Sequence, residues 1–372
     1  MIYLDNAATT FPKPNSVIDG TFECLKKYCG NPGRGTHKLS TKISEKIYEA
    51  RELIASFLGT DSAENVVFCQ NATHALNLAI KTTVKPSTHV LISDIEHNSV
   101  LRPIHALSEN SDVEYSLFDS KNIDNSIPPL IKSNTKYLVS TLASNVLGRE
   151  IPLEKLSEIA KKFNLTLIVD SSQLIGHKEI NLARTPCDVL CAPGHKALFG
   201  IQGAGFAVFS DGIKRPTLFE GGSGNDSKNL SMPELLPERF EAGTLPSPSI
   251  VSLYYGLKFI EKVGLSEIES KLSTLTERYA DIISSFENTT LYEYGNGLVS
   301  FNVGNASSFE IAEEFNKRGI YMRGGLHCAP LAHTVIGTIK GGCVRISLSY
   351  FNSLDECDCF YKAIKSICRL RP

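Results

Sequence analysis

Short apolar runs alternate with helix-like segments through the middle of the chain. The apolar runs occupy residues 66–68, 90–92, 113–118, 137–141, 165–169, 189–191 and 205–209. Apolar residues at helical spacing lie between them, at 75–84, 100–107, 123–131 and 153–163. Strand-length apolar runs that alternate with amphipathic helices are typical of βαβ units, in which helices cover both faces of a mostly parallel sheet. We therefore expect a large α/β domain built on these runs.

The two ends of the chain follow other patterns. Residues 1–15 contain Pro12 and Pro14 and predict an extended arm. Helical spacing at 16–28 and 40–58 flanks a polar turn at 30–37. Beyond residue 250 we expect helices at 250–263, 266–286, 308–318 and 354–369 and strands near 298–303 and 343–348. The predicted domains are therefore a large domain of residues 16–249 and a smaller α+β domain made of residues 1–15 and 250–372.

Composition and charge narrow the class of protein. The chain has 372 residues and a formal net charge of −2, so nucleic acid and anionic membranes are not expected partners. No apolar stretch approaches the roughly 18 residues of a membrane span, and the N-terminus lacks a secretory pattern, which predicts a cytoplasmic protein. Ten cysteines are scattered without a Cys-x-x-Cys pair. We expect reduced thiols and no metal site.

Polar side chains follow the predicted strands, where parallel sheets bind ligands. Thr73 begins the helix after 66–68 and could hold a phosphate, although an ordinary helix cap is the alternative. His97 follows 90–92 and is either a surface residue or a ring-stacking proton carrier. Asn145 follows 137–141. Asp170 ends a buried strand, where a carboxylate needs a cationic or hydrogen-bonding partner.

Lys196 lies in a glycine-rich segment 26 residues after Asp170. A lysine beside glycine is most often a solvated loop residue, but one strand-connection-strand unit brings Lys196 and Asp170 to the same crevice. A partly desolvated lysine, an acid and a phosphate cradle near Thr73 and His195 together describe a pyridoxal 5′-phosphate site. Lys196 would be the Schiff-base lysine, and Asp170 would keep the ring nitrogen protonated.

Several motifs carry a resemblance to a known family. They are Tyr3-Leu4-Asp5-Asn6-Ala7-Ala8-Thr9-Thr10, Ser144-Asn145-Val146-Leu147-Gly148, Val169-Asp170 with Gln173, Gly194-His195-Lys196, Arg239-Phe240-Glu241-Ala242-Gly243-Thr244 and Gly325-Leu326-His327-Cys328-Ala329. Over nearly its whole length, the chain resembles the cysteine desulfurase and selenocysteine lyase family. Members of this family are fold type I pyridoxal-phosphate enzymes of the class V aminotransferase group. The compact loop before Cys328 resembles the group II branch.

The resemblance implies a role for each matching residue. Lys196 would carry the cofactor and Asp170 would pair with its ring nitrogen. Gln173 and Asn145 would contact the ring hydroxyl region, and His97 would stack on the ring. The phosphate would be held by Ala72, Thr73, His195 and, from the neighbouring subunit of a homodimer, Thr244. Arg345 would bind the substrate carboxylate, with Asn6, Ala8, His37 and Arg323 as further candidates for substrate binding.

Cys328 is the second candidate for chemistry. As a lone cysteine it would be a core residue more often than not, but its polar, glycine-rich loop favours an accessible thiolate. The resemblance implies that Cys328 takes sulfur from L-cysteine as a persulfide, leaves L-alanine, and passes the sulfur to an acceptor protein. Leu142, Ala72 and Ser171-Ser172 depart from the family pattern and indicate a divergent subgroup.

Two alternatives remain at this point. One is a selenocysteine lyase, or another β-elimination or amino-group-transfer enzyme with the same cofactor. The other is a non-catalytic sulfur-carrier scaffold or interaction protein, against which the retained Lys196 argues. The destination of the sulfur or selenium, including iron–sulfur cluster assembly, stays open.

Overall fold

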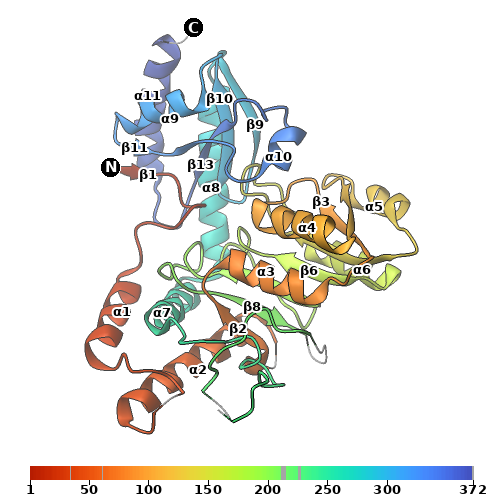
Figure 1. Ribbon diagram of the computed structural model, residues 1–372. Helices are drawn as coiled ribbons and strands as arrows, with labels where there is room; N and C mark the ends of the chain where they lie inside the picture. Colours follow the sequence, from red (N-terminus) through yellow and green to blue (C-terminus); the bar gives the residue numbers. More distant parts are fainter. Residues whose placement is uncertain (34, 61, 211–214, 225–227, 371–372) are drawn as a thin grey trace.

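The computed structural model describes residues 1–372 except 34, 61, 211–214, 225–227 and 371–372. Its largest feature is a seven-stranded sheet (Figure 1). The strand order is β2 (Val66–Cys69), β8 (Gly205–Phe209), β7 (Val189–Pro193), β6 (Thr166–Asp170), β5 (Thr135–Thr141), β3 (His89–Ser93) and β4 (Glu114–Phe118). Within it, only β8 runs against the other strands. The prediction of an α/β fold with a mostly parallel sheet is confirmed.

Helices cover both faces of this sheet because successive strand residues point to opposite sides. Val66 and Phe68 of β2 belong to one apolar core, and Val67 and Cys69 belong to the other. The second core is completed by α3 (Ala72–Thr83) and α4 (Asn98–Ser111). The first core takes in α2 (Lys38–Leu58), α6 (Leu153–Phe163) and α7 (Ser247–Val263).

A second, four-stranded antiparallel sheet lies above the first in Figure 1. Its order is β12 (Arg323–Gly325), β13 (Cys343–Ser347), β10 (Leu298–Val303) and β9 (Thr289–Gly295). The accompanying helices are α8 (Leu265–Ser284), α9 (Ser308–Asn316), α10 (Pro330–Val335) and α11 (Leu354–Leu370). The N-terminal arm joins this part of the molecule, since β1 (Ile2–Tyr3) pairs in parallel with β11 (Ile320–Tyr321). The boundary predicted at residue 249 lies within α7, which packs against α1 (Asn15–Lys27) and α2.

One predicted helix differs from the structure. The helix expected over 123–131 is divided into α5 (Ile123–Ser126) and a 3₁₀ turn at Pro128–Leu130, because Pro128 and Pro129 lack the N–H groups that a continuous helix needs. A further 3₁₀ turn, Ala63–Asn65, precedes β2. The helices among the described residues include none that is both long enough and apolar enough to cross a membrane.

Candidate active site

A cavity of about 260 Å³ lies where the carboxyl ends of the central strands meet the second sheet. Asp170 ends β6, Lys196 follows β7, and Asn145 follows β5. The second sheet contributes Arg345 from β13, and the loop after β12 contributes Cys328. All five line the cavity, so the topology brings together residues that are far apart in the sequence.

The N-terminal arm supports the backbone that presents Lys196. Thr10 Oγ1 donates to the Lys196 carbonyl at 2.8 Å, and Lys13 Nζ donates to the His195 carbonyl at 2.8 Å. The Lys196 side chain is half-buried and lines the cavity. Burial lowers its pKa to about 8, while the nearby Asp170 carboxylate opposes that shift. A lysine in this state has a usable fraction of neutral amine near neutral pH.

Asp170 is only 3% exposed at the end of its strand. One of its carboxylate oxygens accepts a hydrogen bond from the Ser172 backbone N–H at 2.9 Å. The buried carboxylate shares the cavity with Lys196 and opposes the effect of burial on the lysine pKa. Asp170 is therefore placed to stabilise a positive charge within the cavity.

The start of α3 forms an anion cradle in the wall of the cavity. Asn71 caps the helix by accepting from the His74 N–H at 2.9 Å. The N–H groups of Ala72 and Thr73 lie in the first turn, where an α-helix offers no acceptor of its own. Gly205 lets this turn approach the sheet, since a Cβ there would lie 2.7 Å from the Asn71 carbonyl carbon. The arrangement suits a phosphate.

His97 and Thr73 are linked through Ser99. The Ser99 hydroxyl lies 2.9 Å from His97 Nδ1 and 2.8 Å from Thr73 Oγ1. His97 Nδ1 also accepts from the Ser99 N–H at 3.0 Å, so the proton of a neutral ring sits on Nε2. Burial, with the charge of Lys196, lowers the His97 pKa to about 4. His97 therefore presents a neutral ring to the cavity.

Some buried nitrogen atoms of residues that line the cavity lack partners among the described residues. His195 Nδ1 and Arg345 Nε have no hydrogen-bond partner within the part of the chain that the structure describes, although both residues line the cavity. Buried polar atoms without partners are rare and often mark a ligand contact. An anion at the α3 end and a carboxylate near Arg345 would satisfy them.

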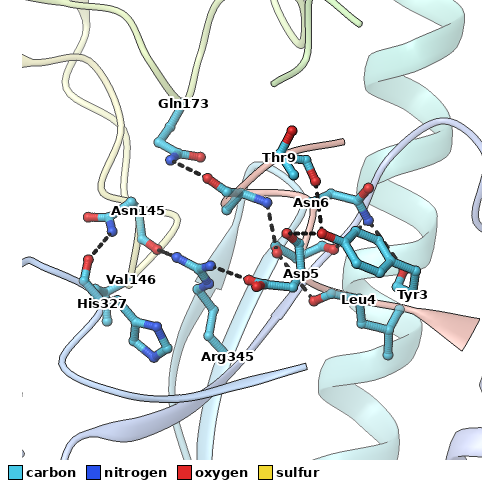
Figure 2. A network of polar contacts seen from close by, with 12 residues as sticks. Tyr3, Leu4, Asp5, Asn6, Thr9, Asn145, Val146, Gln173, His327 and Arg345 are labelled. Atoms are coloured by element: carbon cyan, nitrogen blue, oxygen red, sulfur yellow. Dashed lines mark hydrogen bonds and ion pairs between the residues drawn. The ribbon is translucent and has the colours of Figure 1, made fainter. Parts of the chain in front are cut away.

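Arg345 is 2% exposed and is held from two sides (Figure 2). Its Nη2 lies 2.6 Å from Asp5 Oδ1, and its Nη1 donates to the Asn145 carbonyl at 2.9 Å. The Asn145 side-chain amide in turn donates to the His327 carbonyl at 2.8 Å. Arg345 is thus fixed between the N-terminal arm and the loop that follows β5.

The loop that carries Cys328 is anchored through its backbone. Cys328 is exposed, and its carbonyl accepts from the Asn98 N–H at 2.8 Å. His327 and Cys328 both have positive φ, 49° and 57°, a conformation that costs energy for residues other than glycine and often occurs at functional sites. The thiol is therefore accessible at the edge of the cavity.

The cavity contains most, but not all, of the residues predicted from the sequence. Those that line it are Ala8, Ala72, Thr73, His97, Asn145, Asp170, Gln173, His195, Lys196, Arg323, Cys328 and Arg345. Asn6 does not line it; its amide donates to the Ser347 carbonyl at 2.9 Å. His37 caps α2 by accepting from Ser40 N–H at 3.2 Å. Thr244 is exposed outside this cavity.

Other residues of the site were not predicted. Asn71 and Ser99 line the cavity, and the preference of asparagine for helix N-caps could have identified Asn71. Nothing in the sequence indicated that Asp5 would contact Arg345. Among the residues that depart from the family pattern, Ser172 and Ala72 line the cavity. Leu142 is fully buried in the core, and the Ser171 hydroxyl donates to the Cys191 carbonyl at 2.8 Å.

The fold and the cavity define an α/β enzyme with a buried amine, a carboxylate, an anion cradle and an arginine around one site. The family model for aminotransferase class-V matches residues 2–360. The chain belongs to the aminotransferase class-V family, which implies pyridoxal 5′-phosphate as cofactor. The expectation of this family from the sequence motifs is confirmed.

Similar proteins span nearly the whole chain. A probable cysteine desulfurase of Methanothermobacter thermautotrophicus is 30% identical over 380 residues, which cover 98% of this chain and 94% of the relative. A cysteine desulfurase of Escherichia coli (strain K12 / DH10B) is 28% identical, with 100% and 94% coverage. The apo structure of cysteine desulfurase from Thermococcus onnurineus NA1 superposes with a TM-score of 0.89 at 28% identity, covering 99% of this chain and 94% of that one.

Proposed function

We propose that this protein is a pyridoxal-phosphate-dependent cysteine desulfurase, which converts L-cysteine to L-alanine and transfers the sulfur to Cys328. The observation that carries the proposal is that Lys196, Asp170, Arg345 and Cys328 surround a single cavity. The relatives named cysteine desulfurase support the same reaction.

The cofactor would lie between the α3 cradle and Asp170. Lys196 would bond it covalently and Asp170 would hold a proton on its ring nitrogen. The other contacts would come from Gln173, Asn145, His97, Ala72, Thr73 and His195, with Thr244 of a second copy at the phosphate. When bound, the group supplies an electron sink for negative charge on the substrate carbon. The unpartnered His195 Nδ1 supports this placement.

Arg345 would bind the carboxylate of L-cysteine, because a guanidinium forms paired hydrogen bonds with a carboxylate. Ala8 and Arg323 line the same cavity and would contact the substrate. Asn6 would act indirectly by fixing the arm against Ser347. His37 lies outside the cavity, and its contribution would be to the start of α2.

The chain's own groups would then carry the sulfur transfer. The Cys328 thiolate attacks the sulfur atom of the bound substrate, so that an S–S bond forms as the Cβ–S bond breaks. The Cβ atom takes up a proton, which the amine of Lys196 would deliver, since Lys196 lines the same cavity. The balanced result is L-alanine and a Cys328 persulfide. The exposed position of Cys328 supports onward transfer to a sulfur-acceptor protein.

The protein would act as a homodimer, since Thr244 lies outside the cavity of its own chain. The reaction would take place in the cytoplasm, because Cys328 must remain a reduced thiol to act.

The test is turnover of L-cysteine by the purified, cofactor-loaded protein, with alanine and sulfide both counted. Lys196→Ala should abolish alanine formation, while the exposed Lys258→Ala should not change it. Comparing kcat/KM for L-cysteine, L-selenocysteine and cysteine sulfinate separates a desulfurase from a selenocysteine lyase. Failure of the protein to retain pyridoxal phosphate would support a non-catalytic scaffold instead.

A further inference from the structure

Three side chains with metal-binding atoms converge behind the Cys328 loop. They are His327 in the loop, His333 in α10 and Cys343 at the start of β13. Their ligand atoms all lie within 4.8 Å of one another. Exposed fractions of 4%, 0% and 0% show that the cluster is shielded from solvent. None of the three takes part in the proposed sulfur transfer.

Each imidazole of the cluster has one nitrogen without a hydrogen-bond partner among the described residues. His327 Nε2 lies 3.0 Å from the Cys343 carbonyl and must donate to it, which leaves a lone pair on Nδ1. His333 Nδ1 lies 2.7 Å from the Thr338 hydroxyl. Neither His327 Nδ1 nor His333 Nε2 has a hydrogen-bond partner among the residues whose placement is described. Two buried imidazole nitrogens without a hydrogen-bond partner, beside a thiol, carry a large desolvation cost unless a ligand binds them.

The arrangement of the rings suits a shared ion. The two imidazoles are nearly parallel, at 23°, with centroids 5.8 Å apart. The carbonyl bound by His327 Nε2 fixes the tautomer of that ring, as outer hydrogen bonds do for metal-ligating histidines. Bond lengths of about 2.0–2.3 Å to nitrogen and sulfur are typical of zinc, and small side-chain movements would bring the three atoms to such distances.

We propose that His327 Nδ1, His333 Nε2 and Cys343 Sγ form a binding site for a zinc-class transition-metal ion. Neutral imidazole and thiolate are the ligands that zinc prefers. Binding Zn²⁺ releases the thiol proton of Cys343 to solvent, leaving a Zn–S bond and one net positive charge. Water would complete the coordination.

The protonation states agree with this site. Burial lowers the pKa of His333 to about 4, against a smaller opposing effect of the Leu326 carbonyl, and burial holds the pKa of His327 well below its usual value. Burial therefore favours the neutral form of both rings. Arg345 lies close enough to affect His327 and Cys343, but its charge is paired with Asp5.

The ion would connect the loop of Cys328 to the strand that carries Arg345. His327 precedes Cys328 directly, and Cys343 lies two residues before Arg345. The metal would thereby fix the base of the loop without touching the Cys328 thiol. Its function would be structural and separate from the proposed sulfur transfer.

The experiment is titration of the metal-depleted, cofactor-loaded protein with Co²⁺, followed by displacement with Zn²⁺. One equivalent of Co²⁺ should give tetrahedral ligand-field bands, at longer wavelengths than the cofactor absorbs, together with a thiolate charge-transfer band. Cys343→Ser should remove the charge-transfer band, and His333→Gln should weaken Zn²⁺ binding by about 100-fold or more.

Two matched controls locate the ion. Cys328→Ser should keep the cobalt spectrum, which excludes binding at the active-site thiol. His89→Gln alters a buried histidine whose two nitrogens already contact Thr135 and Ser116, and it should also keep the spectrum. The proposal is overturned if the wild-type protein gives no tetrahedral cobalt spectrum, which is the result expected if only a buried water bridges the rings. It is also overturned if Cys328→Ser abolishes the cobalt spectrum. The wild-type titration decides the matter even if a variant fails to fold.

Discussion

Arg345 Nη2 lies 2.6 Å from Asp5 Oδ1, so an acidic residue of the N-terminal arm neutralises the buried arginine of β13. The arm is thereby fixed to the part of the site where we place the substrate carboxylate. The same arm hydrogen-bonds to the backbone carbonyls of His195 and Lys196. It therefore connects β13 to the segment that carries Lys196.

Replacing Asp5 should destabilise the fold. Asp5→Asn leaves the charge of Arg345 uncompensated in a buried position, and we expect the free energy of unfolding to fall by about 2 kcal/mol. Asp124→Asn is the control, since Asp124 pairs with Lys155 where both side chains are about half exposed or more, and its effect should stay below about 0.5 kcal/mol. Urea denaturation measures both. Equal losses in the two variants would show that the Asp5 pair contributes no more than a surface pair.

Arg345→Lys should weaken substrate binding. Lysine keeps the charge but loses the planar fork, so we expect KM for L-cysteine to rise by about tenfold or more while the cofactor spectrum is unchanged. Cysteamine lacks the carboxylate and serves as the control substrate. If the variant impairs binding of cysteamine as much as binding of L-cysteine, Arg345 does not recognise the carboxylate.

Gly205→Ala should weaken cofactor binding through the backbone. The added Cβ would press on Asn71 and displace the first turn of α3, so the dissociation constant for pyridoxal phosphate should rise by roughly tenfold. Gly341→Ala is the control, because a Cβ there meets nothing within 4 Å. Fluorescence titration of the apoprotein gives both constants, and unchanged affinity in Gly205→Ala would argue against the α3 cradle as the phosphate site.

The large sheet could be predicted because its strands are buried on both faces and form continuous apolar runs. Strand β9 could not be predicted, because its residues are mostly half-buried and do not alternate between buried and exposed positions. β1, β11 and β12 have two or three residues, too few for a pattern. The prediction of a continuous helix at 123–131 was wrong because it gave the apolar spacing more weight than the two prolines.

The residues of the cavity that lie at the ends of predicted strands could be predicted. Asp170 ends a strand, and Asn145 and Lys196 each follow one. The pattern gives the positions of these strands, and the parallel topology brings their ends together. Asp5 and Arg345 are separated by 340 residues, and their contact depends on how the arm crosses β13. The His327, His333 and Cys343 cluster likewise depends on tertiary structure, since its spacing matches no zinc motif.

Cofactor uptake should depend on pH through Lys196. Its pKa is lowered to about 8, so the neutral amine increases as the pH rises through 8. The rate at which the apoprotein binds pyridoxal phosphate should therefore rise about tenfold between pH 7 and pH 9 and then level off. In Asp170→Asn the opposing negative charge is removed, and the midpoint should move to lower pH. A midpoint near the usual lysine value in the wild-type protein would contradict the burial of this amine.

The central claim is that Cys328 receives the sulfur, and intact-protein and peptide mass spectrometry after one equivalent of L-cysteine tests it most directly. We expect one added sulfur atom on the peptide that contains Cys328, with one equivalent of alanine released. Cys328→Ser should show neither the added sulfur nor sustained turnover, whereas substitution of the exposed Cys29 or Cys359 by serine should change nothing. Added sulfur on another cysteine, or unchanged alanine formation in Cys328→Ser, would contradict the account.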